Sequence, residues 1–336
     1  MERNPTLDIL KGFAVIIMIF ANTAPYFYNI ENEIIIRLLF STAAPIFIIT
    51  SGYITYFNVH IKKVEKSKLY LRICQILYGG VLIDTLFWHS IPFITFDVLY
   101  LIAFSQIAII FVNKNHLLKL TFLIFIISPL LFYFFEYRLS IIDTKSISYQ
   151  FVEESNPIKR IFFDGWFPIF PWFGFFLLGV LSLKYSKILS RRLNLNFFLG
   201  ISFLLLYLIL TVDNIPEARN KYLELWYPLY GKSLLIPFSL FFVINGIINY
   251  SFNHKNLIID FIVSIGKNTL FIYTLNAFFV SLIIDYDFIK KIQIDKVYIF
   301  LLMIIILIGF TIILEKIKNT KFWFNFPKLI KFIILN

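Results

Sequence analysis

The stretch SIGKNTLFIYTLN, residues 264–276, contains residue types that bind anions where a helix begins. A glycine, a lysine and two side chains that cap helices follow one another directly before an apolar run. A helix amino terminus beside a lysine is suited to hold phosphate oxygens, which indicates an anion site at Lys267 and Asn268. Asn276 lies two turns deeper and faces the bundle if Thr269 does. The alternative interpretation is an ordinary capped helix start that binds no ligand.

A second group of polar residues lies in LDILKGFAVIIMIFAN, residues 7–22. Asp8 and Lys11 are three residues apart and share a helix face. Asn22 follows Lys11 by eleven residues, which is about three helical turns, so these two side chains are expected to point into one crevice. Charged groups are costly in hydrocarbon, so they are candidates for function. The alternative for Asp8 and Lys11 is an interfacial ion pair that sets the depth of the helix.

The stretch APIFIITSGYITYF, residues 44–57, is expected to form a kinked helix that packs closely on a neighbour. Pro45 predicts the kink, and Ser51 beside Gly52 predicts a close approach of the backbone to another group. Packing at a helix crossing explains these small residues as well as a binding site does.

The stretch DGWFPIFPWFGFFLLG, residues 164–179, combines two prolines with two tryptophans and flanking glycines. Such an aromatic, proline-stiffened segment would suit a mouth in which a sugar ring stacks. It would equally suit an aromatic belt at the membrane interface.

The chain around these residues has the composition of a membrane protein. Of its 336 residues, 59% are hydrophobic and 15% are charged, and its mean hydropathy is +0.81. Soluble domains are about half apolar and about one quarter charged. The apolar residues come in blocks of about 20, the length that a helix needs to cross ~30 Å of hydrocarbon. The sequence therefore predicts an all-α polytopic membrane protein, a bundle of about ten transmembrane helices.

The expected spans follow from the apolar blocks and the charged or turn-rich joints between them. A short apolar stretch, residues 257–265, is expected to lie along the interface or to re-enter the membrane. Residues 1–315 are expected to form one transmembrane domain, and residues 316–336 a basic amphipathic cytoplasmic tail on the inner leaflet. The first apolar run does not read as a cleavable signal peptide, since charges interrupt it. The expected spans are 7–28, 34–57, 69–88, 96–112, 117–135, 167–184, 196–212, 229–250, 268–284 and 297–315.

Lysines and arginines predict the orientation of the bundle. They gather in alternate joints, which places both termini in the cytoplasm of a multi-pass protein of the cell membrane. The net charge of +11 then reflects topology and contact with anionic lipid. It does not indicate nucleic-acid binding, because no soluble basic face is expected. With Cys74 as the single cysteine, no internal disulfide or cysteine metal cluster is expected, and we predict no metal.

Five stretches of the chain resemble, in the same order, the catalytic domain of the heparan-alpha-glucosaminide N-acetyltransferase family and its bacterial and archaeal relatives. More distantly, they are similar to membrane acyltransferases of the acyltransferase-3 type. Together they are spread over most of the length of the chain, so the resemblance implies that the transmembrane domain, residues 1–315, is acyltransferase-like. They are LDILKGFAVIIMIFAN, APIFIITSGY, FDVLYLIAFSQ, FPIFPWFGFFLLG and IGKNTLFIYTLN.

The resemblance implies an enzyme that takes an acyl group from acyl-coenzyme A, with acetyl-CoA as the expected co-substrate, on the cytoplasmic side. It would deliver that group to a sugar amine or hydroxyl that lies on, or opens to, the other side. In this picture Lys11, where the family usually has arginine, and Lys267 neutralise the phosphates of coenzyme A. Asp8 holds Lys11 in place, and Ser51 and Asn268 complete the expected cofactor-binding group.

The chain departs from the family in its histidines. Family members use a histidine as the catalytic base, and relatives carry histidines at the positions of Tyr100 and Asn276. Acyltransferase-3 proteins carry one at the position of Asn22. The four histidines of this chain fall in expected joints or at span ends, and His89 lies on the side where an acceptor would approach. They are His60, His89, His116 and His254.

A different base is therefore needed if the chain is an enzyme. Asn22 and Asn276 cannot accept a proton, although their amides can donate hydrogen bonds to a thioester carbonyl. The candidates for the base are Glu31, Glu33 and Asp164, since a buried carboxylate can do this work. The alternative for the two glutamates is a solvated outer loop.

The leading hypothesis is a membrane acyltransferase that acts on a cell-envelope glycan, with the lipid bilayer and a sugar or glycan acceptor as partners. One alternative is a transporter or flippase that performs no chemistry, although no inverted repeat supports it. Another is a catalytically inactive relative that acts as a scaffold, which the missing histidines favour. Whether the chain forms a homo-oligomer is left open.

Overall fold

The structure is a computed structural model that describes residues 5–27, 33–135, 158, 160–211, 231–249, 256–285 and 296–318. Throughout these ranges the regular elements are helices, and no strand occurs, which confirms the predicted all-α class. Long apolar runs make this outcome necessary in lipid, because a helix satisfies its backbone hydrogen bonds within one segment.

Short π- or 3₁₀-helical segments, labelled η, join or extend several of the α-helices. The α-helices are α1 (Pro5–Phe27), α2 (Ile34–Ser41), α3 (Ala43–Tyr56), α4 (Lys66–Leu82), α5 (Val98–Phe111), α6 (Leu117–Phe135), α9 (Ile169–Lys184), α10 (Ser186–Ser190), α11 (Leu193–Thr211), α12 (Leu235–Asn249), α13 (Leu257–Lys267), α14 (Thr269–Asp285) and α16 (Lys296–Lys318). The shorter segments are η1 (Phe57–Ile61), η2 (Ile83–Phe87), η3 (Lys114–His116), η4 (Arg160–Asp164) and η5 (Gly231–Leu234).

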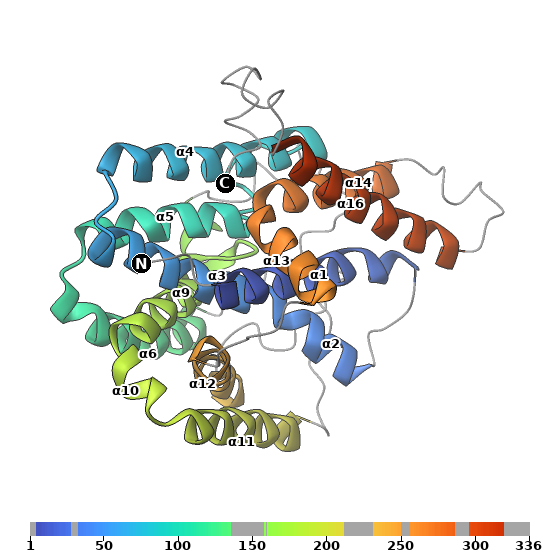
Figure 1. The fold of residues 1–336 in the computed structure, drawn as a ribbon. Coiled ribbons are helices and arrows are strands. Elements are labelled where there is room, and N and C mark those ends of the chain that lie inside the picture. The colour runs from blue at the N-terminus through green and yellow to red at the C-terminus, as the bar shows by residue number, and fades with distance from the viewer. Residues whose placement is uncertain are drawn as a thin grey trace.

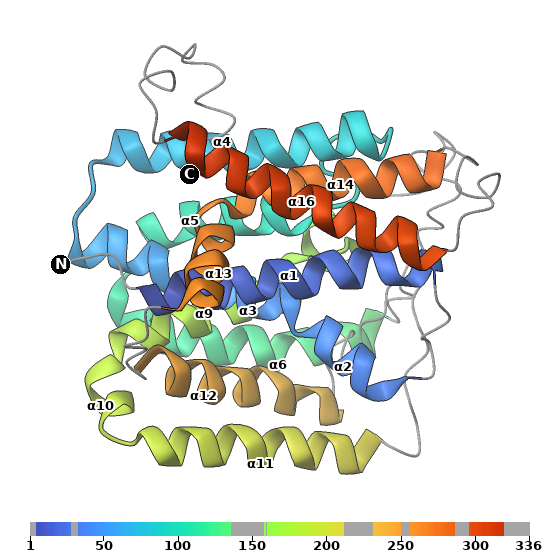
Figure 2. The same cartoon turned by 45° about the vertical axis from the view of Figure 1, so that its right-hand side comes forward.

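Helix α1 lies in the middle of the bundle, where it packs against α3, α13 and α14 (Figure 1). Helices α4, α5, α14 and α16 lie on one side of α1, and α6, α11 and α12 lie on the other (Figures 1 and 2). Most of the long helices run along a common direction in Figure 2, whereas α13 crosses them. Side chains of α1 therefore meet residues that come from both halves of the sequence.

Several of the described helices have the length and composition of membrane spans. Five of the described helices are long and apolar enough to cross a bilayer, or up to six if a bent pair counts as one span. Three shorter apolar helices, α5, α9 and α12, fall below that length. The expected count of about ten spans is therefore not confirmed.

The expected span over residues 34–57 corresponds to one candidate span in the structure, Ile34–Ile61, with a turn at Thr42 inside it. Helix α2 ends at Ser41, α3 begins at Ala43, and η1 carries the helix on to Ile61. Pro45 lies in the first turn of α3, where a missing backbone N–H costs no helix hydrogen bond. The break therefore lies just before the proline, where the sequence predicts a kink.

Helix α13 is the apolar stretch that was expected to lie along the interface or to re-enter the membrane. It meets α14 at an angle of 83°, and Asn268 lies at the break between the two helices. This arrangement is a broken span or a re-entrant loop.

The division into two parts remains a prediction. Helix α16 continues to Lys318, beyond the expected boundary at residue 315. Residues 319–336, which make up nearly all of the expected tail, lie outside the described residues.

Candidate active site

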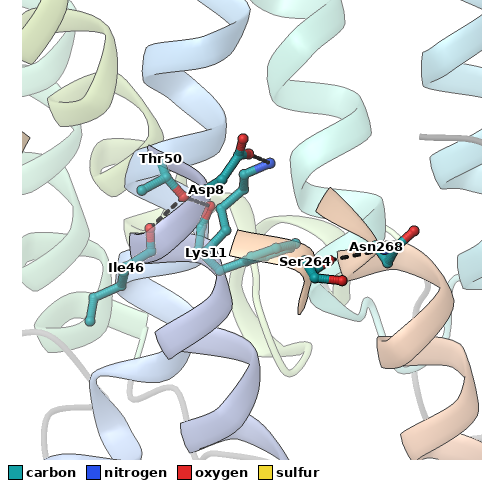
Figure 3. A network of polar contacts seen from close by, with 7 residues as sticks. Asp8, Lys11, Ile46, Thr50, Ser264 and Asn268 are labelled. Atoms are coloured by element: carbon teal, nitrogen blue, oxygen red, sulfur yellow. Dashed lines mark hydrogen bonds and ion pairs between the residues drawn. The ribbon is translucent and has the colours of Figure 1, made fainter. Parts of the chain in front are cut away.

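Asp8 and Lys11 form a buried ion pair on the first turns of α1. The Lys11 Nζ atom lies 3.2 Å from Asp8 Oδ1, and the two residues are 7% and 3% exposed. Figure 3 shows the two side chains turned toward each other beside Thr50 of α3. The pair is packed inside the bundle near the start of α1.

Helix α13 lies directly on the part of α1 that carries this ion pair. A Cβ atom on Gly266 would overlap the carbonyl oxygen of Asp8, and one on Gly12 would overlap the carbonyl oxygen of Ile262. Glycine is therefore required at both positions for the two backbones to touch. The contact holds the end of α13, and hence the start of α14, beside Asp8 and Lys11.

The break between α13 and α14 is closed by hydrogen bonds of Asn268. Its Nδ2 atom donates to the carbonyl oxygen of Ser264 at 2.9 Å (Figure 3), and Lys318 Nζ donates to its Oδ1 atom at 2.7 Å. Helix α14 begins at Thr269, so the predicted helix start lies here, while Lys267 is the exposed last residue of α13. Asn268 is buried and acts as a structural link in this state.

A cavity that we name the Lys11 cavity opens next to the ion pair. Its volume is about 690 Å³, including space open to solvent. Ser51 lines it together with Lys11, as the sequence prediction grouped them, whereas Lys267 and Asn268 are not among its lining residues. Its polar lining residues are Lys11, Ser51, Thr55, Asn58, Arg72, Gln106 and Thr269.

Asn22 and Asn276 meet although 254 residues separate them. Asn22 Nδ2 donates a hydrogen bond of 3.1 Å to Asn276 Oδ1. Asn276 is fully buried, and its own Nδ2 atom has no hydrogen-bond partner in the part of the chain that the structure describes. Leaving a buried N–H donor unpaired costs about 1–3 kcal/mol. This amide is therefore a candidate to donate a hydrogen bond to a ligand.

A second cavity, which we name the Asn22 cavity, lies further along α1. Its volume is about 720 Å³, including space open to solvent, and its lining is mostly apolar. Its polar lining residues are Asn22, Ser41 and Tyr273. Phe47 of α3 lines both cavities, so the two are neighbours along α1 and α3.

A buried carboxylate that was not predicted as a site residue, Asp97, is hydrogen-bonded to Tyr273, which lines the Asn22 cavity. Asp97 caps α5 by accepting a hydrogen bond from the Leu99 N–H at 3.0 Å. Its other oxygen accepts a hydrogen bond of 2.6 Å from the hydroxyl of Tyr273 on α14. The sequence signal is an aspartate directly before an apolar helix, which reads as a cap and gives no hint of its partner 176 residues away.

A second buried carboxylate, Asp84 in η2, holds the connection to α5 in shape. It accepts hydrogen bonds from the Thr95 hydroxyl at 2.5 Å, the Tyr100 hydroxyl at 2.8 Å and the Phe93 N–H at 3.1 Å. Phe93 has a φ of +70°, in the left-handed region that costs free energy in a residue with a side chain. The hydrogen bonds of Asp84 stabilise this connection.

Of the carboxylates predicted as bases, Glu33 is the one whose side chain the structure describes, and it lines neither cavity. Glu33 precedes α2, is exposed and makes no capping hydrogen bond. Glu31 and the side chain of Asp164 lie outside the described residues. The role of these three residues stays a prediction.

The described histidines also lie away from both cavities. His60 packs its ring against Tyr56, with ring centroids 4.6 Å apart, and His89 and His116 are exposed. None of the three is among the lining residues of either cavity. His254 lies outside the described residues.

The aromatic stretch of α9 belongs mainly to the core. Trp172 is fully buried against Phe167 and Phe175, with ring centroids at 5.0 and 5.3 Å. Phe167 is the member of this stretch that lines the Asn22 cavity. Among the described residues, no group of three histidine, cysteine, aspartate or glutamate side chains is placed to hold a metal ion.

Comparison with known proteins gives one match. Residues 3–212 match the family model described as heparan-alpha-glucosaminide N-acetyltransferase, catalytic. The match covers α1 to α11, while Tyr273 and Asn276 on α14 lie beyond it. No curated protein and no solved structure matches the chain significantly.

Proposed function

The chain belongs to the heparan-alpha-glucosaminide N-acetyltransferase catalytic family, and from this premise we propose that it transfers an acyl group within the membrane. The donor is acyl-coenzyme A, in the simplest case acetyl-CoA, which binds from the cytoplasm. The acceptor is the amine or hydroxyl of a sugar in a cell-envelope glycan. The protein lies in the cell membrane with both termini in the cytoplasm.

The observation that carries this proposal is the order of polar groups along α1. A cation, Lys11, lines one cavity, and an amide, Asn22, lines the next, with Phe47 between them. A thioester donor needs positive charge for its phosphates and hydrogen-bond donors for the carbonyl that reacts. The phosphates and the thioester lie at opposite ends of the extended donor molecule, and Lys11 and Asn22 likewise line two different cavities along α1.

The Lys11 cavity is proposed to receive the phosphates of coenzyme A. Lys11, Arg72 and the first residue of α14, Thr269, line it together. The amino terminus of a long helix adds a favourable partial charge for an anion. Asp8 keeps the Lys11 ammonium group in place through the 3.2 Å ion pair.

The amide pair of Asn22 and Asn276 is proposed to hold the thioester carbonyl. The buried Nδ2 atom of Asn276 has no partner among the described residues, so it can donate when a carbonyl oxygen arrives. Donors fixed in advance stabilise the negative charge that develops on this oxygen when the acceptor attacks.

The orientation proposed from the positive-inside rule fits the positions of these cavities along the helices. The Lys11 cavity is lined by residues from the first half of α1 and α14 and mainly from the first half of α4, which is the cytoplasmic half of these helices in the proposed topology. It also extends to Phe47 of α3 and Leu99 of α5, which lie in the first halves of their helices. The donor would therefore enter from the side where coenzyme A is available.

A second candidate is a catalytically inactive relative that acts as a transporter, flippase or scaffold. The observation that favours it is the absence of a described histidine from both cavities. A protein of this kind could bind the donor without transferring its acyl group.

Binding of acetyl-CoA by the purified protein tests the proposed function. We expect the double variant Asp8→Asn/Lys11→Met to bind acetyl-CoA about 10- to 100-fold more weakly than the wild type, because a hydrogen bond to a charged group is worth ~1.5–3 kcal/mol. The double change leaves no lone charge in the bundle. Titration calorimetry in detergent measures the Kd. Lys267→Ala is the control, since Lys267 is exposed and outside the cavity, and should change the Kd less than about twofold. An unchanged Kd in the double variant would remove Lys11 from the coenzyme site.

A further inference from the structure

Tyr273 lines the Asn22 cavity and donates a hydrogen bond to the buried carboxylate of Asp97, whereas Glu33, the one proposed base whose side chain the structure describes, is not among the residues that line this cavity. We propose that Tyr273 accepts the proton of the attacking acceptor while it passes its own hydroxyl proton to Asp97. The inference rests on the proposed acyl transfer and supplies the proton acceptor that this reaction needs.

The geometry places the pair next to the amides that would hold the thioester. Tyr273 and Asn276 are three residues apart on α14 and so share a helix face. Tyr273 and Asn22 line the same cavity, and Asn276 is hydrogen-bonded to Asn22.

Asp97 has the capacity to take a proton through Tyr273. The Tyr273 hydroxyl donates to Asp97 Oδ2 at 2.6 Å, and the carboxylate is 2% exposed. Among the described residues Asp97 makes no ion pair, and its carboxylate accepts hydrogen bonds from one phenol and one backbone N–H. A carboxylate accepts at about four lone-pair positions, so these two hydrogen bonds leave room for a bound proton.

The neighbouring pair of Asp84 and Tyr100 has the same chemistry but a different position. The Tyr100 hydroxyl donates to Asp84 Oδ2 at 2.8 Å, and Asp84 also accepts from Thr95 and from the Phe93 N–H. Neither Asp84 nor Tyr100 lines either cavity. This second pair serves the fold and provides a matched control for the first.

The proposed step balances. The acceptor nitrogen or oxygen forms a bond to the thioester carbonyl carbon, and the bond from that carbon to sulfur breaks. The acceptor proton moves to the Tyr273 oxygen as the Tyr273 proton moves to Asp97. The reverse transfer then returns a proton to the leaving thiolate, which departs as the thiol of coenzyme A. No oxidant, reductant or further reactant takes part.

The test measures release of free coenzyme A from acetyl-CoA, with D-glucosamine as the acceptor probe, by the full chain in detergent. We expect Tyr273→Phe and Asp97→Asn each to lower kcat by about 10²- to 10⁴-fold, the usual contribution of a positioned proton acceptor. The KM for glucosamine and the Kd for acetyl-CoA should stay within about twofold, since neither change removes a binding group. Asparagine caps a helix about as well as aspartate, so Asp97→Asn preserves the start of α5.

Tyr100→Phe is the control, because it removes the equivalent hydrogen bond to Asp84 and should leave kcat within about threefold of the wild type. If Tyr273→Phe or Asp97→Asn retains the wild-type kcat, the proton path is wrong while acyl transfer stands. A loss of kcat in Tyr100→Phe equal to that in Tyr273→Phe also contradicts it, because the effect would then be structural. If the wild type neither binds acetyl-CoA nor releases coenzyme A, the proposed function itself fails, and the inference fails with it.

Discussion

Replacing Asn276 by leucine is expected to lower kcat for acyl transfer by about 10²- to 10³-fold, the usual loss when one donor to a developing oxyanion is removed. The expectation follows from the buried Nδ2 atom of Asn276, which has no partner in the described structure. Leucine has a similar volume, so the packing around position 276 is preserved. The change removes one hydrogen bond of 3.1 Å, and Asn22 still faces the cavity. Rates of coenzyme A release from acetyl-CoA, measured beside thermal unfolding, separate the two effects.

Asn245→Leu provides the control for this prediction. Asn245 is also buried, and its Nδ2 atom donates to Ser182 Oγ at 3.0 Å and to the carbonyl oxygen of Phe241 at 2.6 Å, away from both cavities. It should lose more stability than Asn276→Leu and leave kcat nearly unchanged, because its amide is satisfied within the fold. If Asn276→Leu keeps its kcat, the amide pair does not hold the reacting carbonyl.

Removal of Asp8 alone is expected to destabilise the protein by about 3–5 kcal/mol, because it leaves the Lys11 ammonium group buried without its partner. The two side chains are only 4% and 9% exposed, and α13 covers the turn that carries them. The free energy of unfolding of Asp8→Ala, measured by denaturant titration in detergent, checks this result.

Two further variants make the stability test specific to the buried ion pair. The double variant Asp8→Leu/Lys11→Met should recover most of the lost stability, since neither charge remains. Lys68→Ala breaks an ion pair of the same spacing with Glu65, but both partners are exposed, so no measurable change is expected. If the single variant Asp8→Ala is as stable as the wild type, the charge of Lys11 is solvated. That result would contradict the assignment of Lys11 as a buried cation.

The sequence predicted the helices that form this site better than the contacts between them. Helix α6 begins and ends where its apolar block does, because the period of an apolar helix is local information. Lys11 and Asn22 were expected to point into one crevice, but they line two neighbouring cavities. The position of Lys267 was not readable in the same way. The residues around Lys267 predicted a helix start. In the structure Lys267 is the exposed last residue of α13, the chain bends by 83°, and α14 begins at Thr269.

Asp97 and Tyr273 show what local patterns cannot supply. Each residue reads as ordinary alone, one as a helix cap and the other as an aromatic residue in an apolar helix. Their hydrogen bond depends on how α14 packs against the start of α5, and that contact is set by the whole bundle. The predicted number of spans is not confirmed for a related reason. Apolar blocks mark buried helices and membrane helices alike, and three of the described blocks form helices too short to be counted as spans.

We propose that the Lys11 cavity and the Asn22 cavity, which share Phe47 in their lining, form one path along which an acyl group passes from donor to acceptor. Proteoliposomes that contain D-glucosamine inside and receive radiolabelled acetyl-CoA outside test it most directly, because the donor does not cross lipid unaided. We expect labelled N-acetylglucosamine inside the vesicles with the wild type, and about 10²-fold less with Asn276→Leu. Binding of acetyl-CoA without any labelled sugar inside, or labelled sugar only when glucosamine is supplied on the donor side, would contradict a path through the protein.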